Sequence, residues 1–324
     1  MKKISPKNNL KFFVLLLVEV ALVSAFLSLF VFPNYVFAGF GTDNVTVRTN
    51  LTVGNSATVI DQIDIGGGSI TLIPNDTKKV NCSVQMSDYD GDTTIDTVRA
   101  VFFDPAQASY GSPDDNNSHY TNSSCDIDTS YGDQFQALSN CLFDVWYYAN
   151  ASTWNCTVIV NDSANYIANE SNTTVVQPLL ALGLPDIIQY GTVNATYVSV
   201  ENITNVTNLG NVKVNLSLNG YGFWENDGNA MNCTLGPTEN ISVQYEKFNL
   251  TSSTPGDLTH AQLMGNYTNL TDYPVTQEFN LDYRKNENVN EAWNYTYWRI
   301  YVPLGVAGTC QGNIIFGAVQ ADAG

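Results

Sequence analysis

Three aspartates separated by single residues, Asp88, Asp90 and Asp92, are the side chains of this chain best suited to bind a metal ion. Ca²⁺ prefers several carboxylate and carbonyl oxygens, so this run could ligate it. The spacing differs from that of an EF-hand, because Gly91 comes fourth in the run and the EF-hand needs its glycine later in the loop. The alternative, which the spacing favours, is a turn whose Asp and Gly residues supply the backbone geometry. Ca²⁺ is the one cofactor for which the sequence offers ligands.

The residues that catalysis usually needs are not arranged in a recognisable set. The two histidines, His119 and His260, have no second His or free Cys at a spacing typical of zinc ligands. No Gly-x-Ser-x-Gly motif marks a serine nucleophile, and the glycines at 66–68 lack the Lys and the helix start of a phosphate-binding loop. We therefore expect a protein that is not an enzyme, since no paired acid and base stands out either.

Six cysteines form the second group with distinctive chemistry. An even number of cysteines favours disulfides when the N-terminus resembles a secretory signal, as residues 1–38 do here. Of the many pairings that six cysteines allow, we favour the set in which each bond closes within one predicted domain. The pairs are Cys82–Cys156, Cys125–Cys141 and Cys233–Cys310. By chain entropy the first bond contributes roughly 4–5 kcal/mol and the second about 3 kcal/mol.

Asparagine followed two positions later by Ser or Thr is the most conspicuous repeated pattern. About 21 such triplets occur, where the Ser and Thr content leads us to expect about six by chance. The excess predicts a heavily N-glycosylated exterior, whereas the alternative is that Asn and Thr merely occupy the solvent faces of strands. The candidate glycosylation sites are Asn44, Asn50, Asn122, Asn150, Asn202, Asn266, Asn269 and Asn294. We expect Asn81, Asn155 and Asn232, each directly before a Cys, to be the least occupied.

The cysteines lie in segments whose apolar and polar side chains alternate, as in a strand. Residues 154–160 place Cys156 on an apolar face, and residues 80–86 do the same for Cys82. Two such strands indicate a disulfide between two facing sheets. Trp154 strengthens this prediction, because immunoglobulin-like sandwiches carry an aromatic residue two positions before the second Cys.

Other segments with strand-like patterns follow at short intervals, separated by Gly, Asn and Pro. In the first half they are residues 59–65, 70–73, 97–103, 142–148 and 173–180. In the second half they are residues 187–193, 212–218, 241–245, 278–283, 295–302 and 313–319. Residues 258–264 are the one helix expected beyond the N-terminal segment. This pattern predicts an all-β chain with two tandem Ig-like β-sandwich domains.

The N-terminal residues 1–38 combine a basic start with a long apolar run and small residues before Ala38. They predict a signal peptide, with a retained membrane anchor as the alternative. Glu19 inside the run argues against a permanent span. After residues 1–38 we expect an extended segment at 39–57. The two sandwiches follow at residues 58–182 and 183–324.

The charge of the chain restricts its partners. Removing residues 1–38 takes away four Lys and one Glu, so the net charge changes from −18 to −21. Such a surface repels nucleic acid and anionic lipid. We therefore expect no nucleic-acid partner, and contact with a membrane only through the N-terminal segment if it is uncleaved. Other envelope proteins or glycans are the compatible partners.

Three short stretches resemble the Ig-like domains of secreted archaeal surface glycoproteins. They are the turn at 88–92, the strand with Phe102-Phe103, and Trp154-x-Cys156. Residues 189–193 and 207–212 resemble the "tail" Ig-like repeats of many cell-surface proteins. The antibody pattern differs, because Phe102 or Phe103 occupies the place of its third-strand Trp. The resemblance implies display or adhesion at the cell envelope, for example in an S-layer, without catalytic residues.

Three functions are therefore open. The leading one is a non-enzymatic, secreted or cell-surface glycoprotein for envelope structure or adhesion. The second is a filament or pilus subunit, a homo-oligomer in which the extended segment at 39–57 completes the sheet of a neighbour by strand addition. The third is a Ca²⁺-dependent carbohydrate-binding module. Aromatic residues at 146–148 and 295–298 would suit sugars on an exposed face, although in strands such residues are more often half-buried.

Overall fold

The structure, a computed structural model, describes residues 46–286 and 292–321. It divides into two units, Met1–Gly54 and Asn55–Gly324. In the first unit, the described residues 46–54 are exposed and form neither helix nor strand. The expected signal or anchor segment and Asn44 lie outside the described residues. Within the described part, no helix has the length and apolar character needed to cross a membrane.

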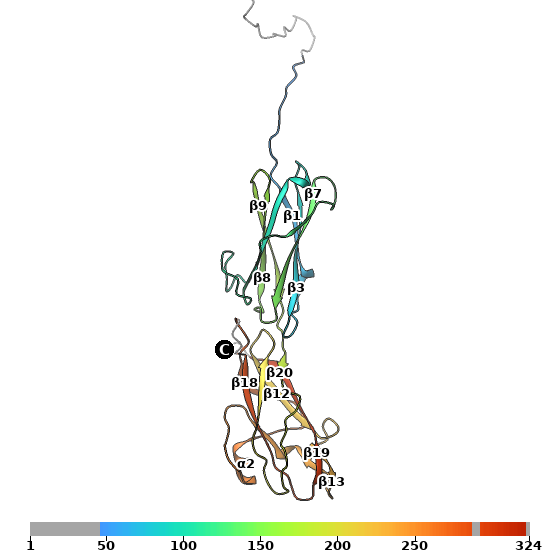
Figure 1. The fold of residues 1–324 in the computed structure, drawn as a ribbon, viewed down its shortest axis with the longest axis vertical. Helices are drawn as coiled ribbons and strands as arrows, with labels where there is room; N and C mark the ends of the chain where they lie inside the picture. Colours follow the sequence, from blue (N-terminus) through green and yellow to red (C-terminus); the bar gives the residue numbers. More distant parts are fainter. Residues whose placement is uncertain (1–45, 287–291, 322–324) are drawn as a thin grey trace, which may run out of the picture. The chain divides into compact units, whose positions relative to one another are not determined.

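The unit Asn55–Gly324 begins with nine strands that form two sheets (Figure 1). The strands are β1 (Val59–Ile65), β2 (Ser69–Ile70), β3 (Thr77–Ser87), β4 (Ile95–Phe103), β5 (His119–Asn122), β6 (Asp126–Asp128), β7 (Gln136–Trp146), β8 (Thr153–Asp162) and β9 (Ile167–Val176). One sheet has the order β1-β3-β7-β6 and the other β2-β9-β8-β4-β5. The pairs are antiparallel except β2 with β9. We call these strands the first sandwich.

The remaining strands form three sheets, which we call the second sandwich. The strands are β10 (Leu182–Gly183), β11 (Asn202–Asn208), β12 (Val214–Tyr221), β13 (Asn229–Leu235), β14 (Asn240–Ser242), β15 (Glu246–Asn249), β16 (Thr268–Asn269), β17 (Val275–Leu281), β18 (Trp293–Ile300), β19 (Ala307–Gln311) and β20 (Asn313–Gln320). The sheets have the orders β10-β11-β18-β15-β16, β17-β12-β20 and β14-β13-β19. The helix α2 (His260–Asn266) and three short 3-10 turns complete the ordered elements in the described ranges, and the all-β prediction is confirmed.

The core of the first sandwich follows from strand alternation. In β8, Trp154, Cys156 and Val158 all point inward and are fully buried. Phe102 of β4 lies opposite Cys156 in the strand register. Its ring stacks on Trp154 with 4.7 Å between the ring centroids. Phe102 therefore fills the space beside the disulfide, where antibody domains have a tryptophan.

The six cysteines form the three pairs that the sequence favours. Cys82–Cys156 connects β3 to β8, which belong to facing sheets, so this bond crosses the first core. Cys125–Cys141 fastens the segment between β5 and β6 to β7. Cys233–Cys310 joins two residues that lie opposite each other on β13 and β19.

Several predicted element bounds need correction. The strand expected at 142–148 is the second half of β7, which begins at Gln136. Residues 187–193 form no strand. The expected helix lies two residues later than predicted, at α2, because Thr259 caps it. The Thr259 Oγ1 accepts the backbone N–H of Gln262 at 3.3 Å, and Gln262 Oε1 accepts that of Thr259 at 2.8 Å.

Asn211 connects the two sandwiches through its side chain, which is 1% exposed. Its Nδ2 donates to the carbonyl oxygens of Ala149, at 2.8 Å, and Gln177, at 3.2 Å. Its Oδ1 accepts the backbone N–H of Leu179 at 2.7 Å. These contacts cross residue 183, where we place the domain boundary, which stays a prediction.

Glu246, whose side chain is 1% exposed in the second core, makes stability depend on pH. Burial raises its pKa from 4.5 to about 7, although the hydroxyl of Tyr190, which donates to Oε1 at 2.8 Å, opposes this. The folded state therefore binds more protons than the unfolded state between these values. We expect the free energy of unfolding to fall by about 3 kcal/mol as the pH rises from about 4.5 to about 7.

Chemical denaturation across this pH range, compared with Glu246→Gln, measures the effect. The amide still accepts from Tyr190 but does not titrate, so the variant should lose less stability as the pH rises. Glu278→Gln, at an exposed carboxylate of β17, is the control and should behave like the unchanged protein. Parallel pH profiles for Glu246→Gln and the unchanged protein would contradict the prediction.

Candidate binding surface

The loop between β12 and β13 presents two aromatic side chains to solvent. Phe223 is 63% exposed and Trp224 is 72% exposed. Their rings contact edge to face, with 4.6 Å between the centroids. We call residues 222–228 the aromatic loop. Two large rings that remain in water are unusual for a surface, and such residues are enriched at the centres of binding interfaces.

Asp227 holds the aromatic loop in one conformation. Its carboxylate accepts four backbone N–H groups: those of Phe223 at 2.7 Å, Asn229 at 2.9 Å, Gly222 at 3.2 Å and Trp224 at 3.2 Å. Burial by itself would raise the pKa of Asp227, but these hydrogen bonds lower it below its usual value. The charged carboxylate thus fixes the backbone that carries the two rings.

The aromatic loop lies in a stretch without glycosylation triplets. The nearest ones begin at Asn215, in β12, and Asn232, in β13. A chain with about 21 such triplets leaves few exposed aromatic side chains with no attachment site beside them. In space the side chain of Asn232 lies beside Gly222 of the loop, but Asn232 is among the triplets that we expect to be least occupied, so we expect the loop to stay accessible.

A second aromatic surface lies on the outer face of β11 and β18. Trp293, Tyr295 and Tyr297 alternate along β18 and pair in register with Thr207, Asn205 and Ile203 of β11. Tyr295 is 38% exposed, and its ring lies 5.1 Å from that of Trp293. Trp298 points the other way and is fully buried. The expected aromatic cluster is thus divided between the core and the outer face.

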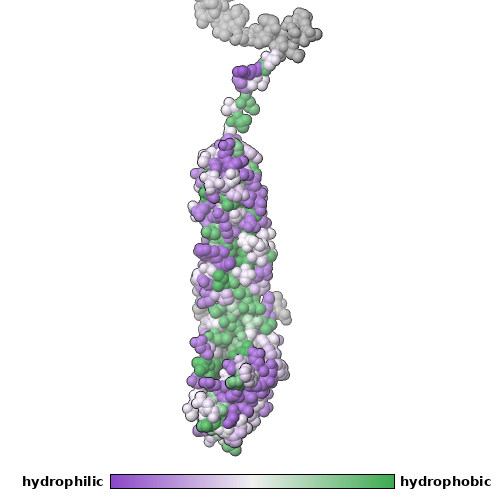
Figure 2. Space-filling model, turned by 90° about the vertical axis from the view of Figure 1, so that its right-hand side faces the viewer, coloured by the Kyte–Doolittle hydropathy of each residue, from purple (hydrophilic) through white to green (hydrophobic). Residues whose placement is uncertain are grey.

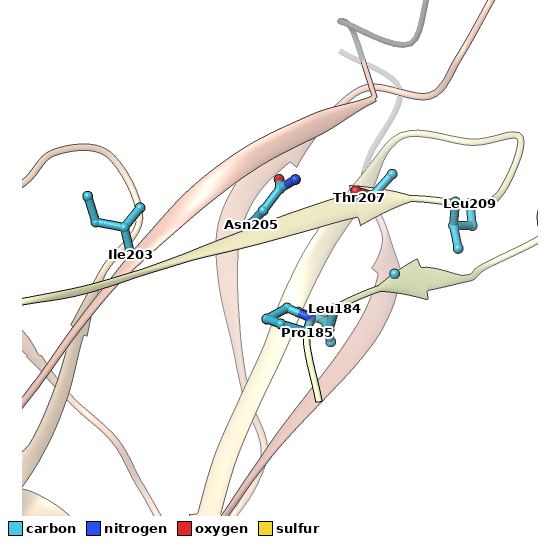
Figure 3. A pocket seen from close by; sticks show the side chains of 7 residues that line it. Leu184, Pro185, Ile203, Asn205, Thr207 and Leu209 are labelled. Carbon is cyan, nitrogen blue, oxygen red and sulfur yellow. The ribbon is translucent and has the colours of Figure 1, made fainter. Parts of the chain in front are cut away.

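Beside these rings, β10 and β11 border an open hollow of about 580 Å³ (Figure 3). Ile203, Asn205 and Thr207 project from the same side of β11, and Leu184 and Pro185 follow β10. Asn205 begins a glycosylation triplet, so an attached sugar would occupy the hollow. This makes the outer face of β11 and β18 a weaker candidate than the aromatic loop.

The three aspartates predicted as Ca²⁺ ligands lie at the end of the first sandwich. Asp88 is fully buried, and its carboxylate accepts the hydroxyl of Thr58 at 2.7 Å and the backbone N–H of Asp90 at 3.0 Å. Asp90 in turn accepts the backbone N–H of Ser56. Asp92 begins a 3-10 turn. These hydrogen bonds agree with the turn alternative, and the Ca²⁺ site stays a prediction.

Among the described residues, no group of three or more His, Cys, Asp or Glu side chains is placed to hold a metal ion. His119 is 1% exposed, and its Nδ1 lies 2.8 Å from a carboxylate oxygen of Asp114. His260 instead stacks on Tyr301, with 3.9 Å between the ring centroids. The two histidines thus have different, local partners.

The candidate glycosylation sites differ in exposure. Those that are exposed are Asn50, Asn266, Asn269 and Asn294, and those that are partly exposed are Asn122 and Asn202. Asn150 is only 9% exposed. Its Nδ2, the atom to which a glycan would attach, donates to Asp104 at 3.2 Å, and its Oδ1 accepts the hydroxyl of Tyr283 at 3.1 Å. Sequence reasoning placed Asn150 among the candidates because a triplet does not show burial.

No protein-family model matches the chain, and no curated protein sequence matches it. Among solved structures, the chain is similar to the CsuC–CsuE chaperone–tip adhesion subunit complex from Csu pili of Acinetobacter baumannii. The two chains are 13% identical and have a TM-score of 0.35, and the match covers 77% of this chain and 96% of that chain. A chaperone–tip adhesin complex of CFA/I fimbriae has 10% identity, a TM-score of 0.30, and coverage of 82% and 84%.

BcpA, the major pilin subunit of Bacillus cereus, has 8% identity and a TM-score of 0.27, with coverage of 83% of this chain and 68% of that chain. Likenesses at these TM-scores carry no argument about function, and none of the three involves an archaeal protein by its description. The resemblance to archaeal surface glycoproteins stays a prediction. The case for a function therefore rests on the residues of this chain.

Proposed function

We propose that this chain is a non-enzymatic extracellular or cell-surface glycoprotein that acts in adhesion, with the aromatic loop as its contact surface. The observation that carries the proposal is the exposure of Phe223 and Trp224, at 63% and 72%, on a loop that Asp227 holds in place. A loop that is already ordered loses little conformational entropy when it binds. Planar aromatic rings suit both the apolar faces of sugars and pockets in other envelope proteins.

Three other features support a place outside the cell. Disulfides persist in oxidising surroundings, and the structure contains three of them. The N-terminal sequence has the basic and apolar regions of a secretory signal. The excess of Asn-x-Ser/Thr triplets suits a glycosylated surface.

Replacing both rings, as Phe223→Ala with Trp224→Ala, is expected to weaken binding to envelope fragments or arrayed glycans at least about 30-fold, the effect of losing about 2 kcal/mol. The melting temperature should stay unchanged, because neither side chain is buried. Tyr273→Ala, which removes another ring that is 58% exposed, is the matched control and should bind normally.

Equal binding by the double variant and the control would overturn the role of the aromatic loop. Repeating the measurement with a chelator tests the Ca²⁺-dependent alternative, which requires binding to disappear when Ca²⁺ is removed. Separate arms with purified glycans and with deglycosylated envelope proteins distinguish the two classes of partner.

Glycosylation itself can be tested by peptide mass spectrometry of the protein from its native host. We expect sugars on exposed sites such as Asn50, Asn266 and Asn294, and a bare Asn150, because the folded protein buries its amide. Unmodified Asn at all exposed sites would refute the glycoprotein proposal. A sugar on Asn150 would show instead that modification precedes folding.

A further inference from the structure

The strand β20 ends a sheet, and β12 is its single hydrogen-bonded neighbour among the described strands. All its residues pair with β12 without a bulge, from Asn313 opposite Tyr221 to Gln320 opposite Val214. No backbone hydrogen bond connects the other edge of β20 to any described residue. Its sequence, Asn-Ile-Ile-Phe-Gly-Ala-Val-Gln, has no charge and no proline.

The other edge strands of the described sheets carry features that discourage pairing with another chain. Six of them, namely β2, β5, β6, β10, β14 and β16, have four residues or fewer. β1 contains Asp61 and Asp64 and a bulge, and β17 contains Glu278 and a register shift. β19 has five residues and a register shift. Compared with these edge strands, β20 is longer, pairs without a register shift and carries no charged residue. A strand with these features is suited to pair with a strand of another chain.

The side chains of β20 that face the core are also incompletely covered. Ile314, Phe316 and Ala318 pack against the second core and yet remain partly exposed. On the adjacent β12, the inward-facing Val214 and Leu216 are both fully buried. Figure 2 shows apolar residues gathered on the lower part of the face turned to the viewer. The core would be covered more fully by one further strand beside β20.

Residues 46–53 have the pattern of such a strand, and no backbone hydrogen bond joins them to a residue that the structure describes. They alternate between Val47, Thr49, Leu51 and Val53 on one face and Thr46, Arg48, Asn50 and Thr52 on the other. The apolar members Val47, Leu51 and Val53 are 71%, 87% and 76% exposed. The segment has no Pro or Gly and the same length as β20, eight residues.

We propose that residues 46–53 of one copy add as a strand to the open edge of β20 in a second copy. Val47, Leu51 and Val53 would then cover the half-exposed side chains of β20, and the backbone groups of both segments would become paired. Arg48 and Asn50 would face solvent, so a glycan on Asn50 is compatible with the assembly. This goes beyond the adhesive role above and does not depend on the aromatic loop.

The acceptor strand must belong to a second copy, because the chain before Asn55 is too short to reach β20 of the same copy. Asn55 is held at the end of β8, where its Nδ2 donates to Asp162 at 2.8 Å. From there β8 runs about 30 Å to its other end, where Ala149 and Asn150 contact the second sandwich. Thr46 lies nine positions before Asn55, so the chain between them spans at most about 30 Å. The segment therefore cannot lie along β20 of its own chain, and pairing between copies produces a head-to-tail series.

The test uses the full processed chain, analysed by light scattering and negative-stain microscopy. The unchanged protein should form a series of multimers. Val47→Asp with Leu51→Asp, which places charge on the apolar face, should give monomers. Arg48→Asp changes the net charge by the same amount on the polar face and should still assemble. On the acceptor side, Ala318→Lys should abolish assembly, because it places a charge on the core-facing side of β20 that Val47, Leu51 and Val53 would cover. The outward Val319→Lys should still assemble.

Mixing the two assembly-defective proteins distinguishes head-to-tail addition from other modes. The first variant keeps its β20 edge and the second keeps its donor segment, so an equal mixture should form heterodimers and nothing larger. Pairing of β20 with itself would leave the Val47→Asp/Leu51→Asp protein able to assemble, which would overturn the proposal. A monomeric unchanged protein, or equal loss with Arg48→Asp, would overturn it too. If Ala318→Lys fails to fold, the donor variants decide alone.

Discussion

Replacing Cys82 and Cys156 together with alanine is expected to lower the free energy of unfolding by about 4–5 kcal/mol, because the bond closes a long loop in the unfolded chain. The two cysteines are separated by 74 positions, and both are fully buried between the facing sheets of the first sandwich. Denaturation in guanidinium chloride under non-reducing conditions measures the loss.

The matched control is the pair Cys125→Ala with Cys141→Ala, whose bond spans 16 positions. A shorter loop loses less entropy, so we expect about 3 kcal/mol there. If the longer loop turned out to contribute less than the shorter one, the account based on chain entropy would be wrong for this fold.

Substituting Arg299 with methionine is expected to cost about 3–5 kcal/mol, because it leaves buried acceptors without a donor. Arg299 is 1% exposed, and its guanidinium reaches the segment before β11, the loop after β15 and the residue that follows α2. Its donors bond to the carbonyl oxygens of Ser199 at 3.0 Å, Thr254 at 2.8 Å and Gly256 at 3.0 Å, and to the hydroxyl of Tyr267 at 3.3 Å.

Lysine at this position should recover only part of the stability, because it keeps the charge without the planar fork of donors. Arg99→Met, at an exposed position of β4, is the control, and we expect it to cost less than about 0.5 kcal/mol. Hydrogen exchange should show faster opening of residues 250–258 in Arg299→Met alone. Similar stability losses for the two methionine variants would contradict the prediction.

The first sandwich could be predicted largely from side-chain alternation. The bounds of β1 are those that the pattern indicates, and the strands around Cys82 and Cys156 extend the predicted segments by one to three residues at each end. The two faces of each of these strands differ clearly in residue type, because one face lies against a core and the other lies against water. The disulfide partners followed from assigning each pair to one domain.

The second sandwich was harder to predict, because alternating apolar and polar residues show which face of a segment is buried but not which strand it pairs with. Residues 187–193 look like a strand, yet Tyr190 enters the core while the backbone around it joins no sheet. The strand β13 was missed, since its pairing with β14 and β19 is interrupted by register shifts. Long-range pairing decides such segments.

The aromatic loop could not be recognised either. A pair such as Phe223-Trp224 is more often buried, and nothing local shows that it faces water. The signal in the sequence that could have indicated it is Asp227-Gly228, three and four positions after Trp224, because Asp followed by Gly is typical of a tight turn. In the structure, Gly228 has a φ of 74°. Glu225 and Asp227 by themselves indicate only a solvated loop.

The two long disulfide loops also determine how the chain would respond to a pulling force. Cys82–Cys156 and Cys233–Cys310 enclose 74 and 77 positions, one loop in each sandwich. In a chain stretched from its ends, the two disulfides would prevent these segments, about 150 residues, from extending. Only the residues outside the two loops would lengthen the chain. Each sandwich would therefore extend by far less than its full contour length before a covalent bond had to carry the tension.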